Sequence, residues 1–121
     1  MIFATNRTPN VLPEKGSLDN LVFDMQNTQV SNEMLYCQRT AKNNYHQINT
    51  STFFESLSQI LNSIDGENHI VFYLHGFNCT NEKEIFPDTE NLQYGFDQVL
   101  EDLKVIVIPL IWPCDDDHLL A

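Results

Sequence analysis

The sequence predicts an α/β domain with a mostly parallel sheet flanked by helices, about four to five strands and two to three helices. Two apolar runs, HIVFYL (residues 69–74) and KVIVIPLIW (104–112), show no alternation of apolar and polar residues, which is typical of strands covered on both faces. An apolar stripe at helical spacing precedes each run. This order of strands and helices predicts a β-α-β unit, and therefore a parallel sheet.

The front of the chain supplies three further expected strands. MIFATN (1–6) is apolar and β-prone, and the Pro- and Gly-containing segment TPNVLPEKGS (8–17) is expected to be a loop. NLVFDM (20–25) and EMLYCQR (33–39) are each expected to be a strand, with a polar turn between them. TAKNNYHQINT (40–50) is polar and is expected to be irregular.

The clearest helix is expected from Thr52 to Ile64. Thr52 and Glu55 have the T-x-x-E spacing of a capping box. Gly66 stands where a left-handed C-terminal cap would lie. Apolar residues recur at spacings of three and four and predict a buried face: Phe53, Leu57, Ile60, Leu61 and Ile64.

A second helix is expected between the two apolar strands. Residues 81–86 can form a short helical turn, which Pro87 is expected to end. Gly95 weakens the helix that follows by roughly 1 kcal/mol relative to Ala. Its apolar stripe comprises Leu92, Phe96, Val99, Leu100 and Leu103.

Pro109 is unusual inside the last apolar strand, because proline donates no hydrogen bond to a neighbouring strand. Two arrangements are compatible with it. Either the pairing stops at Ile108, or that side of the strand is unpaired at this point.

Length and composition indicate one domain over residues 1–121. The hydrophobic fraction of 42% is ordinary for a globular protein. No apolar run approaches the ~20 residues of a membrane span, and the N-terminus does not resemble a secretory signal, so a cytoplasmic protein is expected. The net charge of −11 argues against nucleic acid and anionic membrane surfaces as partners.

The three cysteines, Cys37, Cys79 and Cys114, do not suggest a disulfide framework. Their number is odd, and no C-x-x-C motif is present to suggest a zinc knuckle. Reduced thiols are expected in a cytoplasmic protein.

The strand ends predict where a site would lie. In parallel sheets, ligands bind beyond the carboxyl ends of the strands, which here are HGFN (75–78) and WPCDDD (112–117). Gly76 would allow a sharp turn and a close approach of a ligand, and the N–H groups of Phe77 and Asn78 would then stabilise negative charge on an oxygen. His75 would hydrogen-bond across the loop and hold its shape. The alternative is a tight turn whose His and Asn only pair with backbone groups.

The combination of HIVFYLHGFN, a helical spacer and VIVIPLIWP resembles the α/β-hydrolase fold. Within that family, the sequence is most similar to a bacterial branch of unknown substrate that has HG[YF]N and WP motifs. The segment MIFATNR also resembles the opening strand of that branch. The resemblance implies the N-terminal part of a serine ester or acyl hydrolase that needs no cofactor. It implies that the backbone N–H of Phe77 forms half of an oxyanion hole, that His75 and Gly76 shape the loop, and that Trp112 and Pro113 line the pocket.

The chain does not contain the nucleophile that this family uses. No two glycines flank a serine, so there is no G-x-S-x-G elbow, and every serine precedes the HG loop. We therefore expect an incomplete hydrolase domain, inactive alone, whose small acyl or ester substrate binds only when the fold is completed. In the hydrolase strand order, residues 69–74 would then have a bare edge, which a complementing C-terminal chain or a second copy would cover. The alternative is a non-catalytic interaction protein that oligomerises through this edge.

Two other kinds of site are weighed against these. Cys79 or Cys114 could act as a nucleophile with His75 or His118 as the base, which would require a depressed thiol pKa. The carboxylates and imidazole of DDDH (115–118) could hold a divalent cation. Because consecutive aspartates do not point the same way and acidic loops are usually solvated, no metal and no cofactor are expected.

Overall fold

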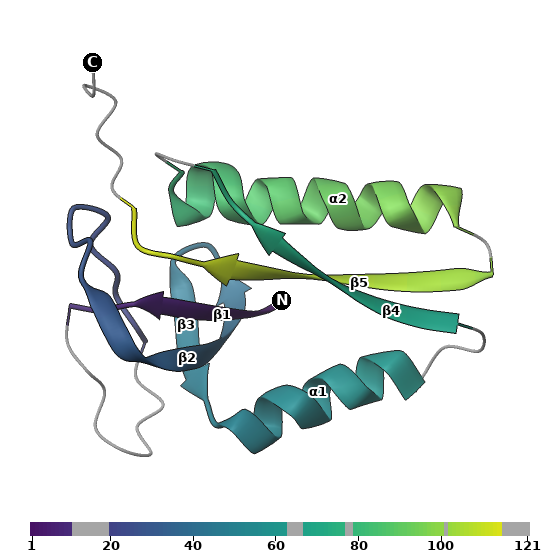
Figure 1. Ribbon diagram of the computed structural model, residues 1–121, viewed down its shortest axis with the longest axis horizontal. Coiled ribbons are helices and arrows are strands. Elements are labelled where there is room, and N and C mark those ends of the chain that lie inside the picture. The colour runs from purple at the N-terminus through teal and green to yellow at the C-terminus, as the bar shows by residue number, and fades with distance from the viewer. Residues whose placement is uncertain (11–19, 63–66, 77–78, 101, 115–121) are drawn as a thin grey trace.

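A computed structural model describes residues 1–10, 20–62, 67–76, 79–100 and 102–114. In these residues a five-stranded sheet has the order β3-β2-β1-β5-β4, with α1 and α2 on opposite faces (Figure 1). The elements along the chain are β1 (Ile2–Arg7), β2 (Val30–Ala41), β3 (Asn44–Ile48), α1 (Thr50–Asn62), β4 (Glu67–Leu74), the π-helical turn η1 (Asn81–Ile85), α2 (Phe86–Val99) and β5 (Leu103–Ile111).

The sheet is mixed. β5 pairs in parallel with both β1 and β4, whereas β2 pairs antiparallel with both β1 and β3. The predicted α/β class is confirmed, and the predicted parallel β-α-β unit is present in the back half. The expectation of a mostly parallel sheet does not hold for the front half, because β2 and β3 return on themselves as a hairpin.

That hairpin corrects two expectations about the front of the chain. Residues 40–50 were expected to be irregular, but β2 and β3 run through them around a tight turn in which Asn43 has a φ of 58°. Asparagine tolerates this left-handed conformation, which hairpin turns require. Residues 20–25, expected to be a strand, do not form one; Asn20 makes an isolated bridge to His46, and the side chain of Leu21 is buried.

Two apolar layers cover the two faces of the sheet, because successive strand residues point to opposite faces. The α1 layer comprises Ile2, Phe53, Leu57, Ile106 and Ile108. The opposite layer comprises Phe3, Leu21, Leu35, Cys37, Tyr45, Ile85, Phe86 and Ile111.

α1 begins earlier than expected. The side-chain Oδ1 of Asn49 accepts a hydrogen bond from the N–H of Thr52 at 2.7 Å, so Asn49 is the capping residue and Thr52 already lies within the helix. Phe53 and Leu57 are buried as predicted, but Ile60 is 38% exposed. Ile64 and Gly66 lie outside the described residues.

α2 differs more from the sequence prediction. Pro87 does not end the preceding turn; it lies in the first turn of α2, where no backbone donor is needed. The predicted apolar stripe is wrong, since Leu92 and Val99 are 40% and 73% exposed while Phe86 and Thr89 are buried. The Gln93 amide instead holds the helix to β5, donating to the Val105 carbonyl at 2.7 Å and accepting from the Val107 N–H at 2.9 Å.

The structure decides between the two arrangements around Pro109. Pairing with β4 continues through Pro109 to Leu110, whereas pairing with β1 begins only at Leu110. The Val107 N–H points away from β4 toward Gln93. The backbone nitrogen of Pro109, two positions later in the strand, points to the same side. Proline therefore lies where its missing donor faces the unpaired side of the strand.

β4 is an edge strand in the described part of the chain, with β5 as its single neighbour. Ile70, Phe72 and Leu74 align with alternate β5 residues that face α1, yet α1 does not cover them. Their exposures are 37%, 56% and 65%. The predicted bare edge is therefore present, but the expectation that β4 is covered on both faces is wrong.

Candidate functional site

The two motifs singled out in the sequence meet at one junction. Because Leu74 of β4 is level with Leu110 of β5, the residues that follow each strand emerge side by side. The His75 ring stacks on the Trp112 ring, with centroids 4.8 Å apart and planes 7° from parallel. We call His75, Trp112, Cys114 and Arg7 the junction.

Both ring nitrogens of His75 are used. Nε2 accepts the backbone N–H of Trp112 at 3.1 Å, so Nδ1 carries the proton that it shares with the Gly76 carbonyl at 2.9 Å. The Trp112 indole N–H donates to the His75 carbonyl at 3.0 Å. Burial lowers the pKa of His75, and the nearby positive charge of Arg7 acts in the same direction. The neutral imidazole thus links the Gly76 carbonyl to the Trp112 N–H, and it has no free nitrogen to act as a base.

Arg7 completes the junction from the end of β1. This buried guanidinium donates through Nη1 to the Asn27 carbonyl at 2.8 Å and through Nη2 to the Cys114 carbonyl. The Cys114 thiol donates to the Cys79 carbonyl at 3.2 Å. Three segments are thereby joined at the carboxyl end of the sheet. The sequence analysis did not single out Arg7; the available signal was a basic residue ending a strand in an acidic chain.

The geometry does not activate a cysteine. Cys114 Sγ lies 3.9 Å from His75 Nδ1, but that nitrogen donates to Gly76. Burial, and secondarily the negative charge of Glu84, raise the pKa of Cys79. A raised pKa disfavours the thiolate that nucleophilic attack requires. His118, the other base considered, lies outside the described residues.

Of the remaining predicted site residues, the structure describes Gly76, Trp112 and Pro113. Phe77 and Asn78 lie outside the described residues, so their role as oxyanion donors stays a prediction. Gly76 is exposed, and a Cβ there would meet only Cys79 Sγ at 3.9 Å, an ordinary contact. Trp112 and Pro113 are half-buried. Residues 115–118 also lie outside the described part, in which no group of three His, Cys, Asp or Glu residues could hold a metal.

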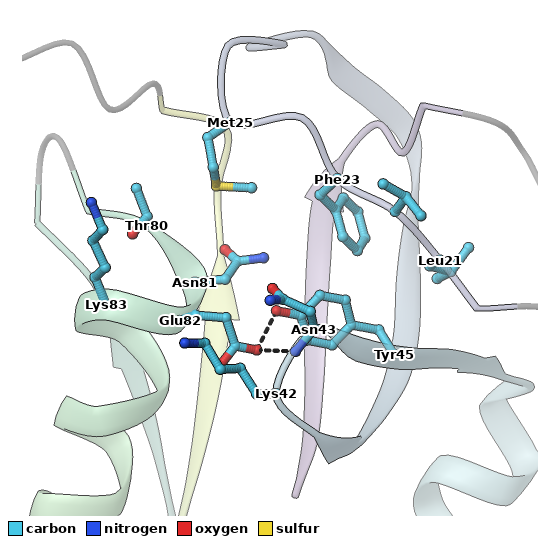
Figure 2. A pocket seen from close by; sticks show the side chains of 11 residues that line it. Leu21, Phe23, Met25, Lys42, Asn43, Tyr45, Thr80, Asn81, Glu82 and Lys83 are labelled. Carbon is cyan, nitrogen blue, oxygen red and sulfur yellow. Dashed lines mark hydrogen bonds between the residues drawn. The ribbon is translucent and has the colours of Figure 1, made fainter.

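A pocket of about 470 Å³ was not predicted from the sequence (Figure 2). One of its lining residues, Thr80, directly follows Cys79, whose carbonyl accepts a hydrogen bond from Cys114 of the junction. It forms where the segment after Asn20, the β2–β3 turn and the start of η1 come together. Its walls are mostly apolar. The lining residues are Leu21, Val22, Phe23, Met25, Lys42, Asn43, Tyr45, Thr80, Asn81, Glu82 and Lys83.

Glu82 forms the best-paired wall of this pocket. Arg39 donates to its two carboxylate oxygens at 3.1 and 2.8 Å. The Asn43 N–H donates at 2.9 Å, and the Tyr45 hydroxyl also donates (Figure 2). Burial alone would raise the pKa of Glu82, but these hydrogen bonds lower it to about 2. The Arg39 guanidinium also lies 4.9 Å from the centre of the Phe86 ring. Glu82 is therefore an ionised structural centre.

Asn81, the neighbour of Glu82, is paired differently. It is only 4% exposed, and its side chain contributes a hydrogen bond to Tyr45. Its Oδ1 is buried and has no hydrogen-bond partner among the residues that the structure describes. Buried amide oxygens almost always have a partner, so this oxygen is an acceptor that a water or a ligand could use.

Comparison with known proteins adds no identification. No protein-family model, no curated protein and no solved structure matches this chain. The hydrolase resemblance thus rests on the sequence motifs alone. Among the helices described here, none is long and apolar enough to cross a membrane.

Proposed function

We propose that this chain forms the N-terminal part of an α/β-hydrolase-like serine ester or acyl hydrolase, with the loop after β4 as its oxyanion loop. The observation that carries the proposal is the contact between His75 and Trp112. It joins the HG and WP motifs at the carboxyl ends of adjacent parallel strands, where α/β sheets bind their ligands. In this role His75 is a positioning residue, and the donors to the oxyanion are the N–H groups of Phe77 and Asn78.

The nucleophile in this proposal comes from a segment that pairs with β4. The hydrolase strand order places the strand before the nucleophile beside the strand that carries the HG loop. Among the described strands β4 pairs with β5 on one side, and such a strand would add on its other side. The serine would attack the acyl carbon and expel the alcohol, and water would then hydrolyse the acyl-enzyme to release the acid.

A fluorophosphonate probe tests this function. We would record intact and native masses of the purified protein, together with any polypeptide that accompanies it, before and after labelling. The expected result is a label on a chain that contains a serine beside this junction. His75→Gln should slow labelling about tenfold to a hundredfold by releasing the loop, while His46→Gln, on β3, should not. A complex with a second polypeptide that takes up no label, or equal labelling rates in the two variants, would contradict the proposal.

A second function is favoured by the exposed face of β4. Large apolar side chains beside an unpaired strand edge are a typical site for adding a strand from another chain. In this alternative the protein is a non-catalytic interaction domain, and its partner is a second copy whose β4 pairs with this one.

Oligomeric state tests the alternative. Phe72→Lys places a charge on the edge strand and should convert a dimer into a monomer in light scattering. Val99→Lys is the matched control, because Val99 is also an exposed apolar residue but lies at the end of α2. A wild-type protein that is monomeric at high concentration, or a dimer that survives Phe72→Lys, would count against this function.

A further inference from the structure

The pocket beside the junction contains space for a small ligand. We propose that it binds a small carboxylate with an apolar, ring-sized body and one hydrogen-bond donor. The proposal rests on the pocket itself and not on hydrolase activity, so it applies equally to a non-catalytic domain.

The walls determine the body of the ligand. Leu21, Phe23 and Met25 come from the segment after Asn20, and the Tyr45 ring stands opposite Thr80 and Asn81 of the η1 end (Figure 2). A volume of about 470 Å³ lies in the range of small-molecule sites. Apolar walls of this kind favour a ring or a short branched chain over a sugar or a phosphate group.

Asn81 determines the donor. Glu82 beside it already has all its bonding capacity directed to Arg39, Asn43 and Tyr45, whereas the Asn81 Oδ1 has no partner in the described residues. Asn81 lies between Met25 and Glu82 in the pocket (Figure 2). A ligand hydroxyl or N–H that reaches this oxygen would satisfy it, and a ligand without one would leave it unpaired.

Two lysines indicate the charge expected on the ligand. The chain has only 6 basic residues against 17 acidic ones, yet Lys42 and Lys83 both line this pocket. Neither takes part in a salt bridge among the described residues, whereas Arg39 and Lys104 are paired with carboxylates. Two ammonium groups left unpaired at one pocket of an acidic protein favour an anionic group on the ligand.

Three related compounds separate these requirements in titrations of the whole chain. 4-Hydroxyphenylacetate has the ring, the donor and the carboxylate; phenylacetate lacks the donor; 4-hydroxyphenylacetamide lacks the charge. We expect 4-hydroxyphenylacetate to bind saturably at millimolar concentration and to shift the NMR signal of the Asn81 side-chain amide. Each of the other two should bind about tenfold more weakly, as expected for one lost hydrogen bond or ion pair.

Charge variants provide the matched control. Lys42→Gln with Lys83→Gln should weaken 4-hydroxyphenylacetate binding about tenfold and leave 4-hydroxyphenylacetamide binding unchanged. Lys104→Gln also removes a positive charge, but outside this pocket, and should change neither. Absence of saturable binding, an Asn81 signal that does not move, or equal binding of all three compounds would overturn the proposal and leave water as the occupant.

Discussion

The His75 ring at the junction and the Asn81 amide in the pocket differ in how completely their polar atoms are paired. At the junction, both nitrogens of the His75 ring are used, and Arg7 donates to carbonyls of two other segments. In the pocket, a buried amide oxygen of Asn81 has no partner in the described residues. The first arrangement fixes a conformation, and the second keeps a group available for binding.

The same contrast exists between two consecutive residues. Glu82 is ionised and accepts hydrogen bonds from three neighbours, so it stabilises the fold. In Asn81, the side-chain Oδ1 has no hydrogen-bond partner in the described residues. A buried acceptor without a partner destabilises a fold, and such a position is retained where function uses it. The contrast predicts a large loss of stability when a fully paired residue is replaced and almost no change when Asn81 is replaced.

The largest effect is expected at Arg7. Arg7→Met keeps much of the volume but leaves the carbonyls of Asn27 and Cys114 without their charged donor, which should lower the free energy of unfolding by about 4 kcal/mol. Urea denaturation at neutral pH measures it. The control is Lys104→Met, which removes a more exposed ion pair and should cost less than about 1 kcal/mol. Equal losses would show that the junction is not a structural centre.

Glu82→Gln should have the next largest effect. A fall in pKa from 4.5 to about 2 on folding corresponds to about 3 kcal/mol of stability at neutral pH. Because the folded pKa lies below the unfolded one, this stability is present above about pH 4.5 and is lost as the pH falls toward 2. The difference between wild type and variant should therefore close at about pH 2 in denaturation curves.

Glu90→Gln provides the control for Glu82. Glu90 lies 3.6 Å from the same Arg39, but its side chain is 60% exposed. We expect a loss below about 1 kcal/mol. A pH-independent loss at Glu82, or a loss at Glu90 of the same size, would mean that the carboxylate charge is not the cause.

His75→Phe should have a moderate effect that depends on pH. The phenyl ring keeps the stacking on Trp112 but leaves the Trp112 N–H without its acceptor, at a cost of about 2 kcal/mol above neutral pH. Burial lowers the folded pKa of His75, so its contribution is present above the unfolded pKa and is lost as the pH falls through the folded value. The gap in the free energy of unfolding between wild type and variant should therefore narrow in acid.

The parts of the fold that follow local rules could be predicted from the sequence. Unbroken apolar runs identified β4 and β5, a three-four periodicity identified α1, and the β-α-β order predicted that β4 and β5 are parallel. The contact between His75 and Trp112, which was not predicted, lies at the ends of these two strands.

The remaining features depend on contacts between distant segments. Tyr45 is the only fully buried residue of β3. The sequence of this strand is therefore mostly polar and shows no apolar pattern. α2 attaches to β5 through the amide of Gln93, which a search for apolar stripes does not detect. The pocket combines residues near positions 21–25, 42–45 and 80–83, and no local pattern records that these segments meet.

The smallest expected change in stability gives the sharpest test of the comparison. Asn81→Leu removes the unpaired oxygen and also the hydrogen bond to Tyr45, so the two effects should offset within about 1 kcal/mol in urea denaturation. The same variant should lose at least about tenfold in affinity for 4-hydroxyphenylacetate, because its donor loses the acceptor.

Thr80→Val is the control for this variant. The Thr80 hydroxyl is paired with Glu84 at 2.8 Å, and its loss should cost about 1 to 2 kcal/mol while the Asn81 acceptor remains. If Asn81→Leu instead destabilised the protein more than Thr80→Val, the amide would be a structural group like His75, and the distinction between junction and pocket would fail. A stable Asn81→Leu protein that no longer binds would show that this buried amide serves a ligand and not the fold.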